Sequence, residues 1–328
     1  MQHELIVPGL DGANPLGFLA ALGVLLVLSE RAGPKPKLAW RNEGSWRPVL
    51  MQHDVATIQS LAGVLSKDLV GWENEPMLAF EYPKLEKLGV KMFAGLRPPL
   101  QIFRPWIRRL RDMNARRSLT YACALLSETA VEEMKEDKGL SAELLAQNGI
   151  PFDPEADSRL GLMPTHFDFT SRNAQFLDQL RHIRGQLTEE AFLAELEGRR
   201  SPLSGVRRME WDPDSSVPGA IQSVATVPVR PAAEWLAFRG LACLPAFGVP
   251  GTLNVTACRG RRKNGRFVWP IWEGCLSSDV VQSVLGYPGW EDASTHVRRT
   301  AGVTAVYTAS LSKAADGYSG RFEPSAVV

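Results

Sequence analysis

The chain has 328 residues, of which 45% are hydrophobic and 22% are charged, and its formal net charge is +1. A chain of this length can bury one large core or two of ordinary size. The balanced charge argues against attraction of the whole protein to nucleic acid or anionic lipid, so such a partner would have to meet a local basic patch.

The first residues predict a short strand, a tight loop and a buried helix. Residues 5–7 are apolar, and Gly9 and Gly12 allow the chain to turn. Asn14 followed by Pro15 is a typical N-cap and first helical position. The next residues carry no charge and are apolar on nearly every side, which is typical of a helix at the centre of a domain. Small residues along it would permit close backbone approach, namely Gly17, Ala20, Ala21 and Gly23.

Two other interpretations of this segment fail on length and spacing. The apolar run is shorter than the ~20 residues that span a bilayer, and no basic region or cleavage site of a secretory signal precedes it. The glycines do not have the spacing of a dinucleotide-binding or P-loop motif, and no lysine follows them. We therefore expect a structural helix, no membrane partner and no cofactor.

The four cysteines point to a reducing compartment. Cys123, Cys243, Cys258 and Cys275 never occur as C-x-x-C, so neither a zinc ribbon nor a disulfide framework is predicted. A cytoplasmic location is expected.

The rest of the chain predicts an α+β fold, mixed and helix-rich, with small antiparallel β elements. A short extended piece is expected at residues 38–41, and a loop-rich excursion at 72–104. Helices are expected from Pro105 towards Glu136, at about 171–184 and 188–199, and from Pro231. An acidic loop at 148–161 suggests a boundary between an N-terminal α/β region, 1–150, and a C-terminal α+β region, 151–328.

A basic hairpin is expected near residues 252–272. Two β-like runs flank Asn264 and Gly265, and Asn-Gly is the favoured pair for a type I′ hairpin turn.

The sequence contains no convincing catalytic or metal centre. The pair His53 and Asp54 echoes a signature of metal-dependent phosphohydrolases, and His166 and Asp168 would share a ligand face on a strand. A solvated helix start and an ordinary hydrogen-bonded histidine are the simpler interpretations. No G-x-S-x-G motif is present, and no cysteine has an evident histidine partner. We predict no catalytic residue, no metal site and no enzymatic activity.

Basic clusters are more informative. The stretch FRPWIRRLRDMNARRSL combines six arginines with a single acid. If it forms one helix, Arg109, Arg116 and Arg117 fall on adjoining positions. Arg108 and Arg111 then form a second stripe, and the apolar residues still face the core. Such a guanidinium surface suits phosphates, although an ordinary solvated face is the alternative. The six arginines are Arg104, Arg108, Arg109, Arg111, Arg116 and Arg117, and the acid is Asp112.

Two further segments are candidate nucleic-acid contacts. The expected hairpin tip would present a compact basic probe to a groove or backbone, or protect a strand edge from aggregation. Ser171 is a candidate N-cap whose first helical turn, with Arg172 and Asn173, would favour a phosphate, with capping alone as the alternative. The residues of the tip are Arg259, Arg261, Arg262, Lys263 and Arg266.

Several segments, in this order, resemble a CRISPR-associated family of type I-G (formerly I-U) effector complexes that includes large-subunit-like proteins. The segments are LDGANPLGFLAALG at 10–23, HFDFTSRNAQFLDQLRHI at 166–183, RRMEWDP at 207–213, AAEWLAFRGLACLP at 232–245 and FVWPIW at 267–272.

The resemblance implies a noncatalytic subunit of a crRNA-guided surveillance complex (Cascade). Its partners would be crRNA, target DNA, the backbone and crRNA-processing subunits, and a helicase-nuclease. In such complexes the large subunit contacts the protospacer-adjacent motif, stabilises the R-loop and recruits the helicase-nuclease. Two alternatives stay open: a metal-dependent nuclease or phosphohydrolase that uses His53 and Asp54, and a purely protein-protein scaffold.

Overall fold

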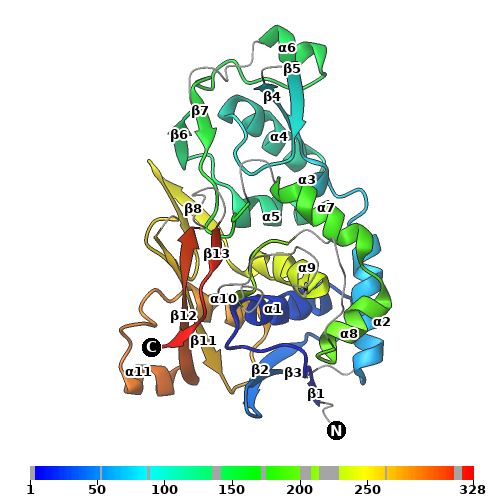
Figure 1. Cartoon of the computed structure of the whole chain (residues 1–328), viewed down its shortest axis with the longest axis vertical. Helices are drawn as coiled ribbons and strands as arrows, with labels where there is room; N and C mark the ends of the chain where they lie inside the picture. Colours follow the sequence, from blue (N-terminus) through cyan, green and yellow to red (C-terminus); the bar gives the residue numbers. More distant parts are fainter. Residues whose placement is uncertain are drawn as a thin grey trace, which may run out of the picture.

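The computed structural model describes residues 4–51, 54–86, 89–134, 142–170, 175–199, 208–213, 229–262, 264–313 and 320–328. Within these ranges the protein has an α+β fold with small antiparallel sheets, which confirms the predicted class (Figure 1). The helices are α1 (Pro15–Ser29), α2 (Ile58–Val70), α3 (Pro76–Ala79), α4 (Leu100–Asp112), α5 (Arg116–Leu125), α6 (Ala142–Gln147), α7 (Phe176–Gln186), α8 (Glu189–Leu196), α9 (Pro231–Gly240), α10 (Ser278–Gly286) and α11 (Thr295–Thr300).

The described strands pair in antiparallel fashion. One sheet has the order β1-β3-β2, and a second has the order β10-β11-β12-β13 with β14 beside β12. The pairs β4-β5, β6-β7 and β8-β9 form separate two-stranded ribbons. The strands are β1 (Glu4–Ile6), β2 (Lys37–Asn42), β3 (Trp46–Met51), β4 (Tyr82–Glu86), β5 (Gly89–Phe93), β6 (Val131–Glu133), β7 (Leu160–Leu162), β8 (Ala246–Val249), β9 (Thr252–Val255), β10 (Cys258–Arg259), β11 (Arg266–Trp272), β12 (Val303–Lys313), β13 (Gly320–Phe322) and β14 (Ala326–Val327).

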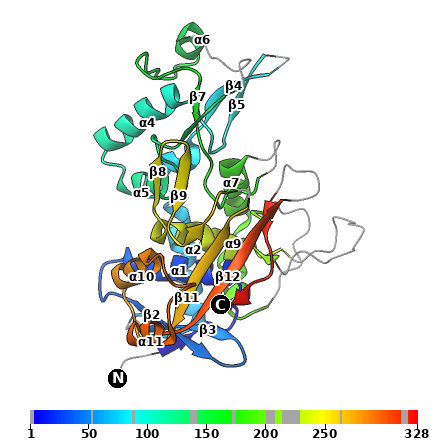
Figure 2. The same cartoon turned by 90° about the vertical axis from the view of Figure 1, so that its left-hand side faces the viewer.

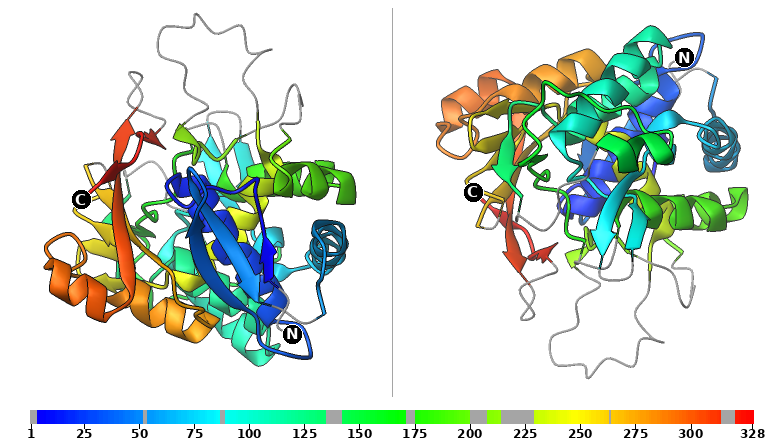
Figure 3. Two further views of the ribbon diagram at one scale, coloured as in Figure 1. Left: turned by 90° about the horizontal axis from the view of Figure 1, so that it is seen from below. Right: turned by 90° about the horizontal axis from the view of Figure 1, so that it is seen from above.

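Helix α1 forms as predicted and lies in the core. The Asn14 side chain accepts hydrogen bonds from the N–H groups of Leu16 (2.8 Å) and Gly17 (3.3 Å), and Pro15 occupies the first helical position. Every residue from 15 to 28 is buried. A helix without a polar face is stable only when other elements surround it, and Figure 3 shows α1 enclosed by strands and helices.

Aromatic side chains place α1 between the two larger sheets. The ring of Phe18 stacks on Trp40 of β2 with centroids 5.5 Å apart, and it contacts Trp269 of β11 at 5.8 Å. Phe18 therefore joins two sheets that come from opposite ends of the chain.

Helices α1 and α9 touch through their backbones. A Cβ on Gly23 would lie 1.8 Å from the carbonyl oxygen of Leu236, and one on Gly240 would lie 2.1 Å from that of Leu19. No larger residue fits either position without moving a helix, which confirms the expected close approach at Gly23. The α1-α9 pair connects residues from both sides of position 150, and one hydrophobic cluster extends from Val7 to Phe322.

The predicted single helix from Pro105 towards Glu136 is wrong. Helix α4 ends at Asp112, and the chain turns at Asn114, which has a φ of 51°. Helix α5 then begins at Arg116, so the arginines are divided between two helices. Asparagine tolerates the left-handed region better than most residues, which makes this break inexpensive.

Pro105 lies inside α4 rather than at its start. Because proline lacks an N–H group, the carbonyl of Gln101 loses its usual helical partner. The amide of Asp153 donates to that carbonyl instead, at 2.9 Å. A residue from a distant loop thus compensates for the proline.

The β10-β11 hairpin exists, but its turn differs from the prediction. Arg259 pairs with Arg266, so residues 260–265 connect the strands, and Asn264-Gly265 is not a two-residue type I′ turn. The carbonyl of Gly265 accepts from the amide of Leu311 at 2.9 Å, next to β11-β12 pairing. This bond ties Gly265 to β12, and Gly265 forms no pair with β10.

The elements between α3 and β7 form the upper part of the molecule in Figure 1, and α4 runs along its outer edge in Figure 2. Within the described ranges, no helix combines the length and apolar character needed to cross a bilayer.

Candidate nucleic-acid interface

The arginines of α4 and α5 fall into two groups, and Arg117 is set apart by its contacts with α1 and with the end of α2. Its guanidinium lies 3.2 Å from the Glu30 carboxylate and donates to the Gly71 carbonyl at 3.2 Å. It also lies 5.2 Å from the centroid of the Trp72 ring. These contacts engage the Arg117 guanidinium, so we do not count this half-buried residue as part of the unpaired basic surface.

Arg104, Arg108 and Arg111 form one stripe along α4, because they are spaced by four and three residues. Arg104 pairs with Glu128 at 3.6 Å, and Arg108 pairs with Asp153 at 3.2 Å. Arg111 is exposed and forms no ion pair with a residue that the structure describes. The stripe therefore becomes less compensated towards the end of the helix.

Arg109 and Arg116 extend this surface around the break between the helices. Both are exposed, and neither has an acidic partner among the described residues. Within the described part of the chain, the Arg116 guanidinium makes one long hydrogen bond, in which Nε donates to Asn114 Oδ1 at 3.4 Å. We call Arg104, Arg108, Arg109, Arg111 and Arg116 the α4 arginine surface.

The tip of the β10-β11 hairpin is docked onto the protein. Arg262 Nε donates to the carbonyl of Thr165 at 3.2 Å, and its Nη2 donates to that of Asp168. Burial lowers the pKa of Arg262. His166 Nε2 bonds to the Gly260 carbonyl at 3.0 Å. Arg262 is thus a structural clamp more than a free probe.

The other arginines of this hairpin are also largely engaged. Arg259 donates to the carbonyls of Cys258 (2.9 Å) and Pro288 (2.6 Å). Arg266 forms a two-point pair with Glu291, at 2.6 and 3.0 Å. Arg261 is exposed and has no ion pair within the described ranges. Lys263 lies outside the described residues, as do Arg172 and Asn173.

Arg97 is a basic residue whose position near the β10-β11 hairpin the sequence does not predict. It is exposed, and its charge acts with burial to lower the pKa of Arg262. It follows β5, far along the chain from the hairpin, and the motif GLRPPL carries no signal of a basic cluster. The fold alone brings Arg97 to the side of the hairpin tip.

Of the two histidine pairs, only His166 and Asp168 lie wholly within the described residues, and their contacts are those of a structural pair. Burial lowers the pKa of His166, so its ring is neutral at pH 7, and its bond to a carbonyl places the proton on Nε2. Asp168 accepts from the amide of Thr170 at 3.1 Å. Asp54 pairs with Arg31 at 2.9 Å, and His53 lies outside the described residues. No described group of three or more His, Cys, Asp or Glu residues is placed to hold a metal ion.

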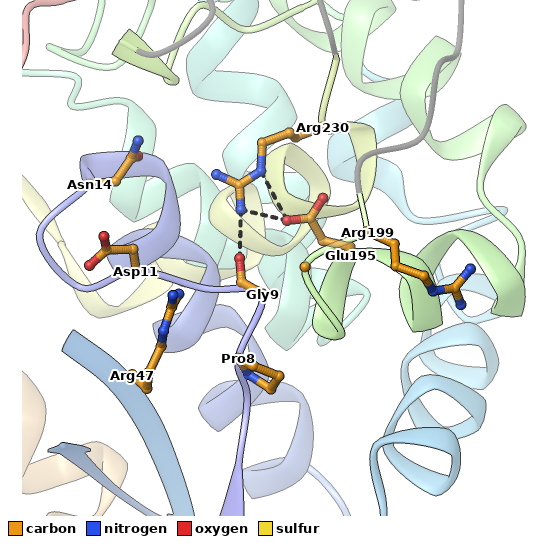
Figure 4. Close-up of a pocket in the computed structure, with 9 residues that line it drawn as sticks. Pro8, Gly9, Asp11, Asn14, Arg47, Glu195, Arg199 and Arg230 are labelled. Carbon is orange, nitrogen blue, oxygen red and sulfur yellow. Dashed lines mark hydrogen bonds and ion pairs between the residues drawn. The ribbon is translucent and has the colours of Figure 1, made fainter. Parts of the chain in front are cut away.

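A polar cavity of about 250 Å³ adjoins the loop that precedes α1 (Figure 4). Arg230 donates to Glu195 at 2.6 and 3.0 Å and to the carbonyl of Gly9 at 3.0 Å. Arg47 donates to the carbonyl of Leu10 at 3.1 Å. The lining residues are Pro8, Gly9, Asp11, Asn14, Arg47, Glu195, Gly198, Arg199 and Arg230.

The loop around this cavity is not arranged as a phosphate cradle. Such a cradle presents free amide N–H groups, whereas this loop directs carbonyl oxygens towards arginines. The amides of Gly9 and Gly12 donate to the carbonyls of Leu196 (2.8 Å) and Trp46 (2.7 Å). Asp11 supplies an acceptor to Ala13 at 2.9 Å. The arginines therefore anchor the loop, and the glycine-marked turn is a structural junction.

Comparison with known proteins adds no family, because no family model matches the sequence and no curated protein matches it.

Proposed function

We propose that this chain is a noncatalytic, nucleic-acid-binding subunit of a type I-G CRISPR RNA-guided surveillance complex. The observation that supports it best is the α4 arginine surface, in which Arg109, Arg111 and Arg116 are exposed without a described acidic partner. A planar guanidinium binds phosphate through two hydrogen bonds, and several together attract a polyanion.

The alternative of an ordinary solvated face is less consistent with the charge pattern. Solvated faces usually mix both signs, as exposed Arg199 does with Glu190 and Glu197. Within the arginine-rich stretch the one acid is Asp112. Among the described residues, Glu128 pairs with Arg104 and Asp153 pairs with Arg108, and neither pairs with Arg109, Arg111 or Arg116. The outer part of α4 therefore keeps a positive charge that a phosphate backbone would neutralise.

This role agrees with the division of labour in RNA-guided complexes. Base pairing with crRNA reads the target, so the protein needs backbone contacts and a few groove contacts. We assign R-loop stabilisation to the α4 arginine surface. Arg261 is the better candidate for contact with the protospacer-adjacent motif, since Arg262 is clamped to the Thr165 and Asp168 carbonyls. Sister subunits and the helicase-nuclease are the expected protein partners.

The test is a variant in which Arg109, Arg111 and Arg116 are all changed to alanine. Its affinity for duplex and single-stranded DNA should fall alike for all sequences. A plot of log K against log salt concentration has a negative slope, and it should become less steep by about 0.9 for each duplex phosphate that the variant no longer neutralises. Binding titrations across a salt series measure both quantities.

A matched control removes the same charge elsewhere. Arg159, Arg199 and Arg321 are exposed arginines with their own acidic partners, and replacing all three with alanine should leave the salt slope nearly unchanged. Equal effects of the two triple variants would contradict an interface on α4. Absence of DNA binding by the unaltered chain, together with copurification of sister subunits, would favour the scaffold instead.

A further inference from the structure

The β8-β9 hairpin displays an aromatic ring that the core does not use. Phe247 is 59% exposed, whereas its neighbours on the opposite face of the hairpin, Leu253 and Val255, are 4% and 3% exposed. Exposed Val249 lies two residues further along the same face of β8. Leaving a phenylalanine beside a valine in water forgoes the stabilisation that burial of the two side chains would provide.

The backbone that carries Phe247 is firmly held. Phe247 pairs with Asn254 across the hairpin. The Thr129 hydroxyl donates to the carbonyl of Gly248 at 2.9 Å, and a Cβ on Gly248 would lie 2.5 Å from that hydroxyl oxygen. The hairpin therefore lies directly on the segment after α5, and the ring projects from a fixed base.

The same segment connects the hairpin to the α4 arginine surface. Thr129 contacts the hairpin, and its neighbour Glu128 pairs with Arg104 at 3.6 Å. Figures 1 and 2 both show the hairpin next to α5. The hairpin thus stands at the Arg104 end of the stripe formed by Arg104, Arg108 and Arg111. Gly248 faces the segment after α5, and Phe247 projects from the opposite, outer face of the same strand.

We propose that Phe247 is a stacking platform for an unpaired base, and that the α4 arginine surface binds single-stranded DNA in preference to duplex. This inference rests on the proposed function. Arginines that follow a backbone, with an aromatic ring beside them, are the combination by which proteins bind single strands. A duplex would occupy the arginines but not the ring, because its bases already stack on one another.

The experiment compares Phe247→Ala and Phe247→Tyr with the unaltered chain on three labelled probes: a thymidine homopolymer, the same strand with abasic sites, and a duplex of equal length. Phe247→Ala should weaken binding of the homopolymer about 5- to 150-fold, the range expected for the loss of one base-aromatic stack. Phe247→Tyr keeps a ring and should bind nearly as tightly as the unaltered chain. On the abasic strand and the duplex, the alanine variant should equal the unaltered chain.

The salt dependence separates this inference from the proposed function. Phe247→Ala removes no charge, so the salt slope should stay the same, whereas the triple arginine variant should lower it. Tyr287→Ala, which alters an exposed aromatic residue at the end of another helix, is the control and should have no effect. Stable folding of each variant is verified by its melting temperature.

Two outcomes would overturn the stacking role. One is an equal loss of affinity for all three probes, which would indicate a structural effect. The other is unchanged affinity of Phe247→Ala for the homopolymer. If that variant also no longer copurified with other subunits, the ring would be a protein contact instead. In both cases a reduced slope in the arginine variant would leave the proposed function standing.

Discussion

Helices α9 and α4 both carry arginines, yet the fold uses them in opposite ways. Arg239 on α9 is fully buried, 2.9 Å from Glu30 and 3.2 Å from Asp68, and its guanidinium lies 4.8 Å from the centroid of the Trp72 ring. Arg109 on α4 is exposed and has no acidic partner among the described residues. The residue type is the same in both helices. What distinguishes a structural arginine from a candidate binding arginine is whether the fold places carboxylates beside it.

Buried Arg239 belongs to an ion-pair network rather than to a single bridge. Arg117 reaches the same two carboxylates as Arg239, at 3.2 Å from Glu30 and 3.8 Å from Asp68. Burial raises the pKa of Asp68, and the arginines oppose this effect. Removal of one cation would leave the buried Asp68 carboxylate with too little compensation.

The largest expected effect tests the buried side of this comparison. Arg239→Ala should lower the free energy of unfolding by about 3–5 kcal/mol, because Asp68 and Glu30 lose their buried partner. Urea denaturation measures the change. Arg109→Ala is the matched control and should stay within about 0.5 kcal/mol of the unaltered chain. Similar losses in both variants would mean that burial does not distinguish the two arginines.

A second variant tests whether the helix that carries Arg239 is fixed by backbone contact. Gly23→Ala should cost about 1–3 kcal/mol, since the new methyl group would meet the carbonyl of Leu236 and push α9 away from α1. Gly185→Ala is the control, because a Cβ there meets nothing within 4 Å. A normal melting temperature for Gly23→Ala would show that the two helices can separate without cost.

Glu234 sharpens the comparison as a buried acid with no ion pair to a described residue. It is 2% exposed, and it accepts from the amide of Met209 at 2.9 Å. Burial raises its pKa from 4.5 to about 8. Between pH 4.5 and about 8, the folded state therefore keeps a proton on Glu234 that the unfolded state has lost. The stabilisation from this proton is complete below pH 4.5 and is lost as the pH rises through about 8.

The measured quantity is the pH dependence of the free energy of unfolding. This group should contribute a decrease of at most about 1.4 kcal/mol per pH unit between the two pKa values. Glu234→Gln should remove that decrease, and Glu143→Gln, at an exposed position, should not. If the Glu234→Gln variant retained the slope of the unaltered chain, the carboxyl would not be the group that titrates.

Local signals predicted much of the fold. Asn14 and Pro15 marked the start of α1, and Pro231 marked the start of α9, because caps and prolines act within a few residues. The same kind of local signal gave the wrong start for α4, because Pro105 lies inside that helix. Proline favours a helix start, and the Asp153 amide that allows it inside α4 comes from a distant loop. In the β10-β11 connection, Gly265 likewise bonds to a residue distant in the sequence, Leu311.

The candidate site was less accessible to sequence reasoning. Arg116 and Arg117 are adjacent, and only the fold shows that Arg117 turns to Glu30, which is 87 residues away. The sequence around Phe247 is that of an ordinary β-strand. It does not predict that the face of the hairpin that carries Phe247 is exposed to solvent. In both cases, residues that are distant in the sequence determine whether the side chain is paired or exposed.

The contact between α1 and α9 also affects how the protein is made. Pro15 opens α1 and Pro231 opens α9, so 216 residues (231 minus 15) separate the two starts. At the usual rates of translation, about 5–20 residues per second, the wholly apolar α1 waits about 10–40 s for the helix that covers it. During that interval the nascent chain exposes a segment that chaperones bind, and loss of such assistance should cause aggregation during synthesis before it affects the finished protein.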